Sequence, residues 1–373
     1  MTLLALALAA GALAIVGAQE RLASGTGEAA FLSRIRKVTV AGARAGEGYF
    51  SPDGRRMVFQ SEREAGNPFY QIYDLDLETG ESRRISPGHG KTTCAFYRPG
   101  RLDVLFSSTH HDPTSRAQQQ AELEFRASGQ QRRYAWDYDD EMEIYVASAD
   151  NGNLTRLTNV RGYDAEASYS PDGEWIVFAS NRQAYERPLG EGDAAKLDVD
   201  AAYFADIYRM RADGSDVQRL TTTPGYDGGP FYTPDGRILW RRFDEGGLIA
   251  DVWIMEADGQ HPRRITDFGA MSWAPYMHPS GRYIFFASNK LGFDNFEVYI
   301  VDSEGTREPV QVTHTPGFDG LPVPLPDGAT LSWTSSRGGG GGQIYFAAWN
   351  HDHALAALAA APPRVPHATR GGH

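Results

Sequence analysis

The sequence has very little cysteine, and this limits how the fold can be held together. Cys94 is the only cysteine in the 373 residues, so no disulfide can form within the chain. Stability must therefore come from packing and hydrogen bonding alone. Basic residues are also few: 36 Lys and Arg stand against 48 Asp and Glu, for a formal net charge of -12. Because phosphate binding needs a basic surface, this balance argues against a nucleic acid partner.

Motifs of common hydrolases and metal sites are missing as well. The chain has no G-x-S-x-G nucleophile elbow and no H-E-x-x-H, and one cysteine excludes C-x-x-C. We therefore expect a protein without catalytic activity of its own and predict no resident cofactor. Isolated Ser, His and Asp side chains that converge in the folded chain are the alternative.

One apolar run stands at the N-terminus, from Leu3 to Val16, followed by the small residues Gly17 and Ala18. The run is too short and too rich in alanine to be a good membrane span. We interpret residues 1–18 as a signal peptide and 19–30 as a linker, which predicts a periplasmic or secreted protein without a membrane span. No Lys or Arg stands near Met1, so an uncleaved anchor is the alternative.

A turn motif recurs along the chain, and each time an apolar run follows it. The copies, aligned on their proline, are YFSPDGRRMVF (Pro52), FYRPGRLDVLF (Pro99), SYSPDGEWIVF (Pro171), FYTPDGRILW (Pro234), YMHPSGRYIFF (Pro279) and VPLPDGATLSW (Pro326). Proline fixes φ, Asp hydrogen-bonds to its own backbone and Gly accepts a positive φ, so each copy predicts a tight turn between two strands. The run after the turn is apolar on both faces, which is typical of a strand buried on both sides.

A second motif keeps step with the turns. QIYDLDLETGESRRIS, EIYVASADNGNLTRLT and DIYRMRADGSDVQRLT are its first three copies, and DVWIMEADGQHPRRIT and EVYIVDSEGTREPVQVT follow. QIYFAAWN, near the C-terminus, is a truncated sixth copy. Each full copy predicts a strand, a turn and a second strand that ends in Thr or Ser.

The two motifs together give units of four antiparallel strands, which predict a six-bladed β-propeller over residues 31–350. The last unit lacks its outermost strand. We expect residues 33–40, SRIRKVTV, to supply it and so close the ring, which removes exposed sheet edges. A closed ring of this kind is expected to be a monomer. Residues 351–373 combine a short Ala-Leu helix signal with a proline-rich tail.

The turn, the apolar strand and the IY and LT strands resemble the WD40-like PD40 repeats of TolB-type propellers. The propellers that precede the catalytic domain of M28-type peptidases look most similar. This resemblance implies a binding domain for a protein or peptide. The alternatives are the substrate-gating propeller of an M28-type or prolyl-oligopeptidase-like peptidase without its catalytic domain, and a propeller lyase or glycosidase with its site in the channel.

Three aspartates share one repeat position, seven residues before the turn proline. They are Asp164, Asp227 and Asp319. Since this position starts the innermost strand, we expect them at one mouth of the channel, with Glu166 and Trp273 close by. They either accept hydrogen bonds from neighbouring loops and lock the blades, or they recognise a peptide amine or a cation such as Ca²⁺.

Two insertions, at about 109–142 and 183–205, follow the second strands of blades two and three. Both should emerge on the same face and form a wall beside the channel. On this face we take His111, Tyr134 and Trp136 as candidate binding residues. His110, His111 and Asp112 are the best metal-like cluster, but neighbouring residues on a strand point to opposite faces, which favours loop hydrogen bonding and helix capping over metal binding.

The signal peptide interpretation leads to a direct prediction. The small residues before Gln19 form a cleavage site, so N-terminal sequencing of the protein purified from its native cells should begin near Gln19. A mature protein that still starts at Met1 and fractionates with the cytoplasm would contradict export.

Overall fold

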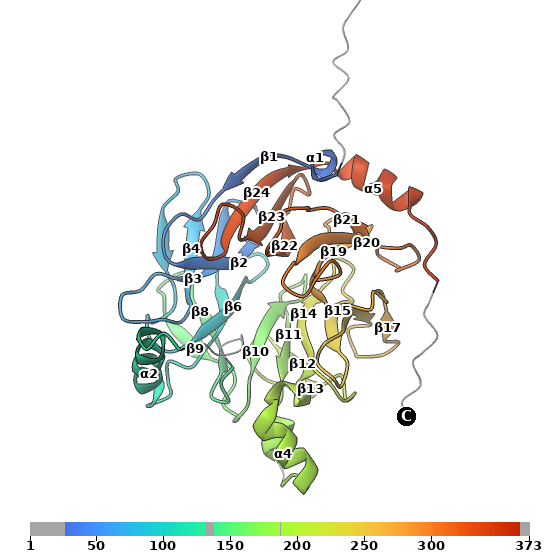
Figure 1. Ribbon diagram of the computed structural model, residues 1–373. Coiled ribbons are helices and arrows are strands. Elements are labelled where there is room, and N and C mark those ends of the chain that lie inside the picture. Colours follow the sequence, from blue (N-terminus) through green and yellow to red (C-terminus); the bar gives the residue numbers. More distant parts are fainter. Residues whose placement is uncertain (1–26, 131–137, 187, 366–373) are drawn as a thin grey trace, which may run out of the picture.

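The computed structural model describes residues 27–130, 138–186 and 188–365. These residues form six four-stranded antiparallel sheets, arranged as blades around a common axis (Figure 1). The predicted six-bladed β-propeller is therefore confirmed. The predicted signal peptide lies outside the described residues.

The first three blades run from the axis outward in chain order. Blade one is β2 (Arg44–Phe50), β3 (Arg56–Glu62), β4 (Gln71–Asp76) and β5 (Ser82–Arg84). Blade two is β6 (Thr92–Tyr97), β7 (Val104–Ser108), β8 (Glu143–Ala147) and β9 (Leu154–Arg156). Blade three is β10 (Ala165–Tyr169), β11 (Trp175–Ser180), β12 (Asp206–Arg211) and β13 (Gln218–Arg219).

Blades four and five repeat this order, and blade six combines the two ends of the chain. Blade four is β14 (Asp227–Tyr232), β15 (Ile238–Phe243), β16 (Ala250–Met255) and β17 (Arg263–Arg264). Blade five is β18 (Ser272–Met277), β19 (Tyr283–Ser288), β20 (Glu297–Asp302) and β21 (Val310–Gln311). Blade six is β22 (Asp319–Pro324), β23 (Thr330–Ser335), β24 (Gln343–Trp349) and β1 (Leu32–Lys37).

The apolar strands after the turns lie between neighbouring blades, as their composition predicts. Every residue of β7 and of β19 is buried, and in β11 only Trp175 is partly exposed. A strand that is covered on both faces cannot alternate apolar and polar residues, which explains the continuous apolar runs.

Short helices decorate the ring. They are α1 (Glu28–Phe31), α2 (Ser115–Ala127), α3 (Gln183–Glu186), α4 (Glu191–Val199), the 3-10 helix η1 (Ala201–Phe204) and α5 (His351–Ala360). α2 begins at Ser115, directly after a turn that is closed by a hydrogen bond from the Ser115 backbone nitrogen to the Asp112 carbonyl oxygen, at 3.1 Å. The Asp112 carboxylate still accepts a hydrogen bond from the Thr114 backbone nitrogen, at 2.8 Å. Within the described residues, no helix is long and apolar enough to cross a membrane.

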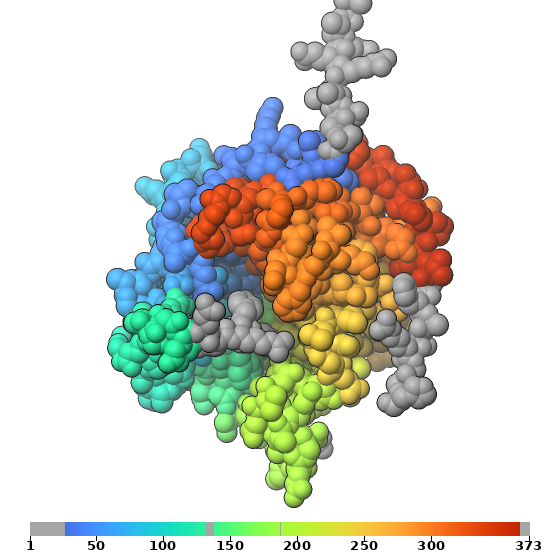
Figure 2. All heavy atoms as spheres, in the orientation of Figure 1, coloured from blue at the N-terminus to red at the C-terminus, as the bar shows by residue number. Residues whose placement is uncertain are grey.

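All blades have the same strand order, so the connections from second to third strands emerge on one face, which we call the insertion face. α2 belongs to such a connection in blade two, and α3, α4 and η1 belong to one in blade three. The starts of the innermost strands lie on the same face, and the six proline turns lie on the opposite face. α2 and α4 both project from the body of the ring (Figure 2).

The N-terminal strand closes the ring. β1 pairs antiparallel with β24, with Leu32 opposite Trp349 and Lys37 opposite Tyr345. β1 lies beside β24 along the outer edge of blade six (Figure 1). Phe31 is 5% exposed, and its ring stacks on Trp349 with centroids 5.8 Å apart. The expected closure by the N-terminal strand is therefore confirmed.

A repeated hydrogen bond explains why the outermost strands end in Thr or Ser. In each blade this hydroxyl accepts a hydrogen bond from the backbone nitrogen of the Ile or Val in the third strand, at 2.8–3.0 Å. The pairs are Ile72 with Ser86, Ile144 with Thr158, Ile207 with Thr221, Val252 with Thr266, Val298 with Thr313 and Ile344 with Thr39. The outermost strands are short, so this contact anchors them where the backbone ladder has ended.

The residue before that Ile or Val completes the contact. It is Gln in blades one and six and Asp or Glu in the others, and its side chain meets the same hydroxyl, as in Thr313 to Glu297 at 2.6 Å and Thr39 to Gln343 at 2.7 Å. Burial of these carboxyls raises the pKa of Glu143, Asp206 and Glu297 to about 7. These three carboxyls therefore take up a proton at a higher pH than an exposed carboxyl does.

Ring closure can be tested within one segment. Phe31→Ala should lower the free energy of unfolding by about 3 kcal/mol, because it leaves a cavity against Trp349. Ile35, in β1 itself, is 39% exposed, so Ile35→Ala should cost less than about 1 kcal/mol. Urea unfolding of both variants measures the difference. If both variants lowered the free energy of unfolding by an equal, small amount, packing of Phe31 against Trp349 would not be what stabilises the closed ring.

The raised pKa of Glu297 predicts a pH dependence of stability. The pKa of Glu297 in the folded protein, about 7, exceeds the ordinary glutamate value of 4.5. The stability that Glu297 contributes is therefore complete below about pH 4.5 and is lost as the pH rises through 7. Gln already occupies this position in blades one and six. As the pH rises from 4.5 to 8, the free energy of unfolding of Glu297→Gln should therefore increase by about 1–2 kcal/mol relative to that of the wild type.

Urea unfolding at both pH values measures this gain. Glu256→Gln, at an exposed position, is the control and should follow the wild type at both pH values. A constant difference between Glu297→Gln and the wild type would show that Glu297 ionises in the folded protein as it does in the unfolded chain.

Candidate functional site

Every innermost strand carries a β-bulge at the same repeat position. The pairing register shifts there in all six blades, and the residue five before the turn proline has a positive φ, between 50° and 58°. The six residues are Glu47, Cys94, Glu166, Gly229, Ala274 and Leu321. Bulges re-aim side chains, and left-handed backbone is costly for all but glycine. The channel lining is therefore built on one repeated irregularity.

Glu166, one of the predicted site residues, reaches from blade three to blade four. Its Oε1 accepts hydrogen bonds from Tyr226 Oη at 2.7 Å and from Arg241 Nη2 at 2.8 Å. Its Oε2 accepts one from the Gly229 backbone nitrogen at 2.5 Å. Arg241 is 6% exposed, and although burial lowers its pKa, the Glu166 charge raises it above the ordinary value. Glu166 and Arg241 therefore form an ion pair inside the channel.

Two glycines of β14 make room for this ion pair. A Cβ on Gly229 would lie 2.1 Å from Arg241 Nη1. A Cβ on Gly228 would lie 2.5 Å from the Tyr226 ring and 2.6 Å from Glu166 Oε2. Any larger residue at either position would displace the guanidinium or the carboxylate.

Glu47 occupies the same repeat position as Glu166, in blade one. Its Oε1 accepts hydrogen bonds from Cys94 Sγ at 3.3 Å and Tyr49 Oη at 3.2 Å. Burial and, to a smaller extent, the Glu166 charge raise the pKa of Glu47 to about 7, and burial raises the pKa of the Cys94 thiol. Glu47 is therefore a channel carboxyl that changes its charge near neutral pH, beside a neutral thiol.

An aromatic layer fills the axis two residues further along these strands. Its members are Tyr49, Phe96, Phe231 and Tyr276. The rings of Tyr49 and Phe231 come from opposite blades, one and four, yet their centroids are only 5.3 Å apart. This layer closes the channel toward the proline turns. Glu47, Glu166 and Trp273 are partly exposed, so solvent reaches them from the insertion face.

The wall beyond Arg241 is aromatic. Trp273, another predicted site residue, lies 6.2 Å from Phe296 and 6.2 Å from Phe318, centroid to centroid. The Arg241 guanidinium carbon lies 5.8 Å from the Trp273 ring centroid. Arg241 thus links two residues that the sequence singled out, Glu166 and Trp273.

The three aspartates of the predicted rim each bind an arginine of their own blade. Their carboxylates are at most 1% exposed. The pairs are Asp164 with Arg182 at 2.5 Å, Asp227 with Arg242 at 2.6 Å and Asp319 with Arg337 at 2.6 Å. They stand at the starts of the innermost strands or directly before them, each bound to an arginine at or beyond the end of the second strand.

Burial nevertheless raises the pKa of Asp164 and of Asp319, against the lowering effect of their arginines. In blade six, Arg337 also pairs with the Glu28 carboxylate at 2.8 Å. This contact holds the start of α1 beside the channel mouth on the insertion face. The contacts of the three aspartates therefore join strands within a blade, whereas the hydrogen bonds expected from the sequence were to neighbouring loops.

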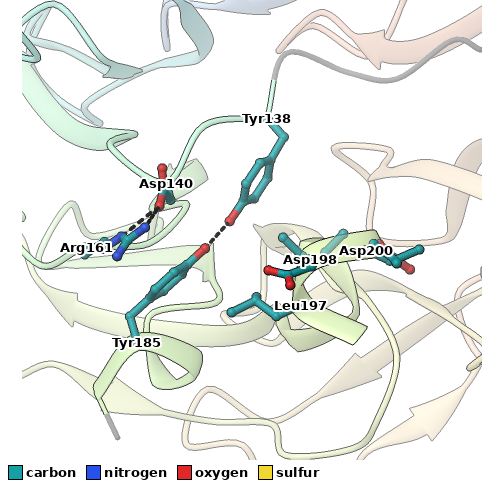
Figure 3. Close-up of a pocket in the computed structure, with 10 residues that line it drawn as sticks. Tyr138, Asp140, Arg161, Tyr185, Leu197, Asp198 and Asp200 are labelled. Atoms are coloured by element: carbon teal, nitrogen blue, oxygen red, sulfur yellow. Dashed lines mark hydrogen bonds and ion pairs between the residues drawn. The ribbon is translucent and has the colours of Figure 1, made fainter. Parts of the chain in front are cut away.

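A cavity of about 620 Å³ lies on the insertion face, where the connections of blades two and three meet. On one side, Tyr138 Oη and Tyr185 Oη are 3.0 Å apart, and Arg161 pairs with Asp140 at 2.6 Å (Figure 3). On the other side, the end of α4 and the start of η1 contribute Leu197, Asp198, Val199, Asp200, Ala201 and Ala202. The cavity combines two phenol rings with aliphatic and acidic groups.

Of the remaining predicted residues, the structure describes His111, which lies in the same connection of blade two as its neighbour His110. His111 Nδ1 is 3.0 Å from Tyr145 Oη, and His110 Nδ1 is 2.9 Å from Ser108 Oγ. Tyr134 and Trp136 lie outside the described residues. In the parts of the chain that the structure describes, no three His, Cys, Asp or Glu side chains gather so that they could hold a metal ion.

Three residues of the channel escaped the sequence analysis: Glu47, Cys94 and Arg241. Glu47 and Cys94 share the bulge position with Glu166, five residues before the turn proline, so comparing that column across the repeats would have found them. Arg241 lies within the apolar strand ILWRRF, and its charge inside a strand buried on both sides was the available signal.

Known proteins resemble this chain in two ways. Solved structures share its fold over most of its length, whereas sequence similarity covers smaller parts. No protein-family model matches the chain. An uncharacterized protein of Agrobacterium fabrum, Atu1656, is 37% identical over 117 residues, which are 31% of this chain and 33% of that protein.

Two shorter or weaker matches follow. The uncharacterized peptidase YuxL of Bacillus subtilis is 26% identical over 148 residues, 35% of this chain and 21% of that protein. The Tol-Pal system protein TolB of Bordetella pertussis is 42% identical over 57 residues, 14% of this chain and 13% of that protein. The chain thus matches a third or less of the length of each of these three relatives.

Solved structures match over most of this chain. A TolB-like protein of Agrobacterium tumefaciens has a TM-score of 0.57 and 21% identity, over 84% of this chain and 94% of that one. TolB of Acinetobacter baumannii has a TM-score of 0.54 and 16% identity, over 83% and 64%. An oligogalacturonate lyase in complex with manganese has a TM-score of 0.51 and 14% identity, over 86% and 94%. By these comparisons the chain is a TolB-like six-bladed β-propeller in its fold.

Proposed function

We propose that this chain is an exported binding propeller without catalytic activity of its own, which holds a protein or peptide partner against its insertion face. The fold likeness to two TolB proteins supports a binding propeller, and the predicted signal peptide supports a periplasmic or secreted location. The argument from this molecule itself rests on how its exposed apolar side chains are distributed.

The insertion face carries most of the large exposed apolar side chains of the described loops. They are Val40, Val160, Val199, Leu248, Leu291 and Phe293, with exposed fractions from 37% to 87%. They stand in connections that leave several different blades, around the channel mouth. Exposed apolar groups gathered on one face mark interaction surfaces, because burying them against a partner is favourable.

The opposite face is poorer in such groups. Among the described residues of its connections, Leu102 and Val217 are the large apolar side chains that are exposed, at 43% and 41%. The aromatic layer also closes the channel on this side. Both the apolar groups and the open end of the channel thus favour one face for binding.

The cavity between the insertions adds specificity to this face. Its phenol rings offer flat apolar contact together with hydroxyl groups, and Asp198 and Asp200 add negative charge. Pockets that combine apolar surface with a few placed polar groups are typical of binding sites. An extended peptide or a protruding loop of a partner fits a cavity of this size.

A second candidate is the substrate-gating propeller of a peptidase. The match to the peptidase YuxL over 148 residues favours it. In this case the polar layer around Glu166 and Arg241 would receive peptides that pass to a separate catalytic domain.

Matched surface variants test the leading proposal. Leu248→Ser with Phe293→Ser removes apolar surface from the insertion face, and Leu102→Ser with Val217→Ser does the same on the opposite face. Tagged full-length protein is used to capture partners from an envelope extract, and captured proteins are quantified by mass spectrometry. We expect a partner that the wild type and the opposite-face variant retain and that the insertion-face variant loses at least tenfold.

Other outcomes contradict the proposal in different ways. Loss in the opposite-face variant alone would assign binding to the other face. Turnover of peptide reporters or of oligogalacturonate by the purified protein would favour an enzyme. All four substituted positions are exposed, so both variants are expected to remain folded. Thermal melting of both variants checks this.

A further inference from the structure

The channel contains one carboxylate that has no cationic partner. Glu166 pairs with Arg241, and the three rim aspartates pair with arginines of their own blades. Glu47 forms no ion pair with any described residue. Its carboxylate accepts only the weak Cys94 thiol donor and the Tyr49 hydroxyl. Glu47 is thus the channel carboxylate whose charge no described residue compensates.

The groups around Glu47 cannot supply the missing charge. Tyr49 on its own strand and Cys94 on β6 stay neutral, since burial raises the pKa of both. Glu166 on β10 repels it, and Arg241 on β15, although it attracts Glu47, is already bound to Glu166. On β23, Thr334 accepts a hydrogen bond from the Glu47 backbone nitrogen at 3.2 Å and does not reach the carboxylate. None of the described residues around Glu47 therefore supplies a cation to its carboxylate.

A second observation also points to a missing group in this layer. Arg241 is only 6% exposed, and its buried Nε has no hydrogen-bond partner among the described residues. Buried donors are almost always satisfied, so an orphan donor marks a place where an acceptor is absent. The described residues of the channel layer thus provide neither a cation for Glu47 nor an acceptor for Arg241 Nε, and a peptide carries both groups, as an ammonium group and a carbonyl oxygen.

The shape of the channel sets further limits on the ligand. The aromatic layer below Glu47 prevents passage through the ring, and the wall of Trp273, Phe296 and Phe318 offers apolar surface and π faces. Ammonium groups bind favourably over such faces when water is excluded. The ligand therefore enters from the insertion face, ammonium end first, with an apolar stem.

We propose that Glu47 is the receptor for a primary ammonium group of a peptide, which enters the channel from the insertion face and ion-pairs with the Glu47 carboxylate. Binding requires ionised Glu47, so a protonated Glu47 releases its proton when the ammonium group binds. A peptide N-terminus and a lysine side chain are the two sources of this chemistry. The ammonium site itself is argued from the channel residues. Only the assumption that a protein partner carries the ammonium group rests on the proposed function.

Calorimetry with small probes tests the site directly. We use the full chain with 3-phenylpropylammonium and its neutral counterpart 3-phenylpropanol, at pH 6 and pH 8. With a Glu47 pKa of about 7, roughly a tenth of the carboxyl is ionised at pH 6, so the ammonium probe should bind about tenfold more weakly there than at pH 8. The alcohol should bind at least tenfold more weakly than the ammonium at pH 8 and show no pH dependence.

Two matched variants assign the effect to one carboxyl. Glu47→Gln should abolish the preference for ammonium, its pH dependence and the release of protons, which is measured in buffers of different ionisation enthalpy. Glu297→Gln removes a carboxyl whose pKa is also raised to about 7, but in the third strand of blade five, and should bind like the wild type. Unchanged ammonium binding in Glu47→Gln, or equal binding of ammonium and alcohol to the wild type, would overturn the proposal.

Two peptide probes distinguish the sources. An N-acetylated tripeptide amide with a central lysine carries only the side-chain ammonium, and triglycine amide carries only the N-terminal one. The tighter of the two identifies the source, and binding of neither would confine the site to small amines and overturn its peptide assignment. If a partner binds the insertion face while the ammonium probes do not bind, this inference alone fails. If the ammonium probes bind while no partner binds the insertion face, only the proposed function fails.

Discussion

The pairing of β1 with β24 is the contact on which the rest of the structure depends. Without it, the six blades would be a linear array with two exposed ends. With it, each blade packs against two neighbours, and an axis exists on which residues of all six innermost strands meet. No disulfide supports this closure, so it rests on backbone hydrogen bonds, on the burial of Phe31 and Leu32, and on the contact of Thr39 with Gln343.

Closure gives the repeated bulge its meaning. One bulge in one strand would re-aim one side chain, but six bulges at the same level bring the same repeat position of all six blades to a common axis. The repeat keeps the backbone geometry there and varies the chemistry: two glutamates, one cysteine, one glycine, one alanine and one leucine. The channel is therefore polar over blades one to four and apolar over blades five and six, and a ligand meets two different walls.

The fold followed from the sequence because its evidence was repeated six times. The turn motif and the apolar strand each have a local cause, and the Thr or Ser that ends the outermost strand was visible before its hydrogen bond was known. Within the candidate site, the sequence analysis predicted Glu166 and Trp273 beside the channel mouth, but it did not predict Arg241. Its position depends on Gly228 and Gly229 of another strand, and no local pattern shows that these glycines make room for a guanidinium.

The aspartates show the limit of reading identical residues as a common binding site. Asp164, Asp227 and Asp319 drew attention because they match, yet each carries its own arginine and its charge is compensated within its blade. These three aspartates solve a local problem of the blades that carry them, which is to anchor the innermost strand to the second strand. A ligand breaks the symmetry of the ring, so the residues that meet it are expected where the repeat differs from copy to copy. Glu47 is such a residue. Its backbone conformation is the same as that of the other five bulge residues, but none of those five has a charge that no described residue pairs with.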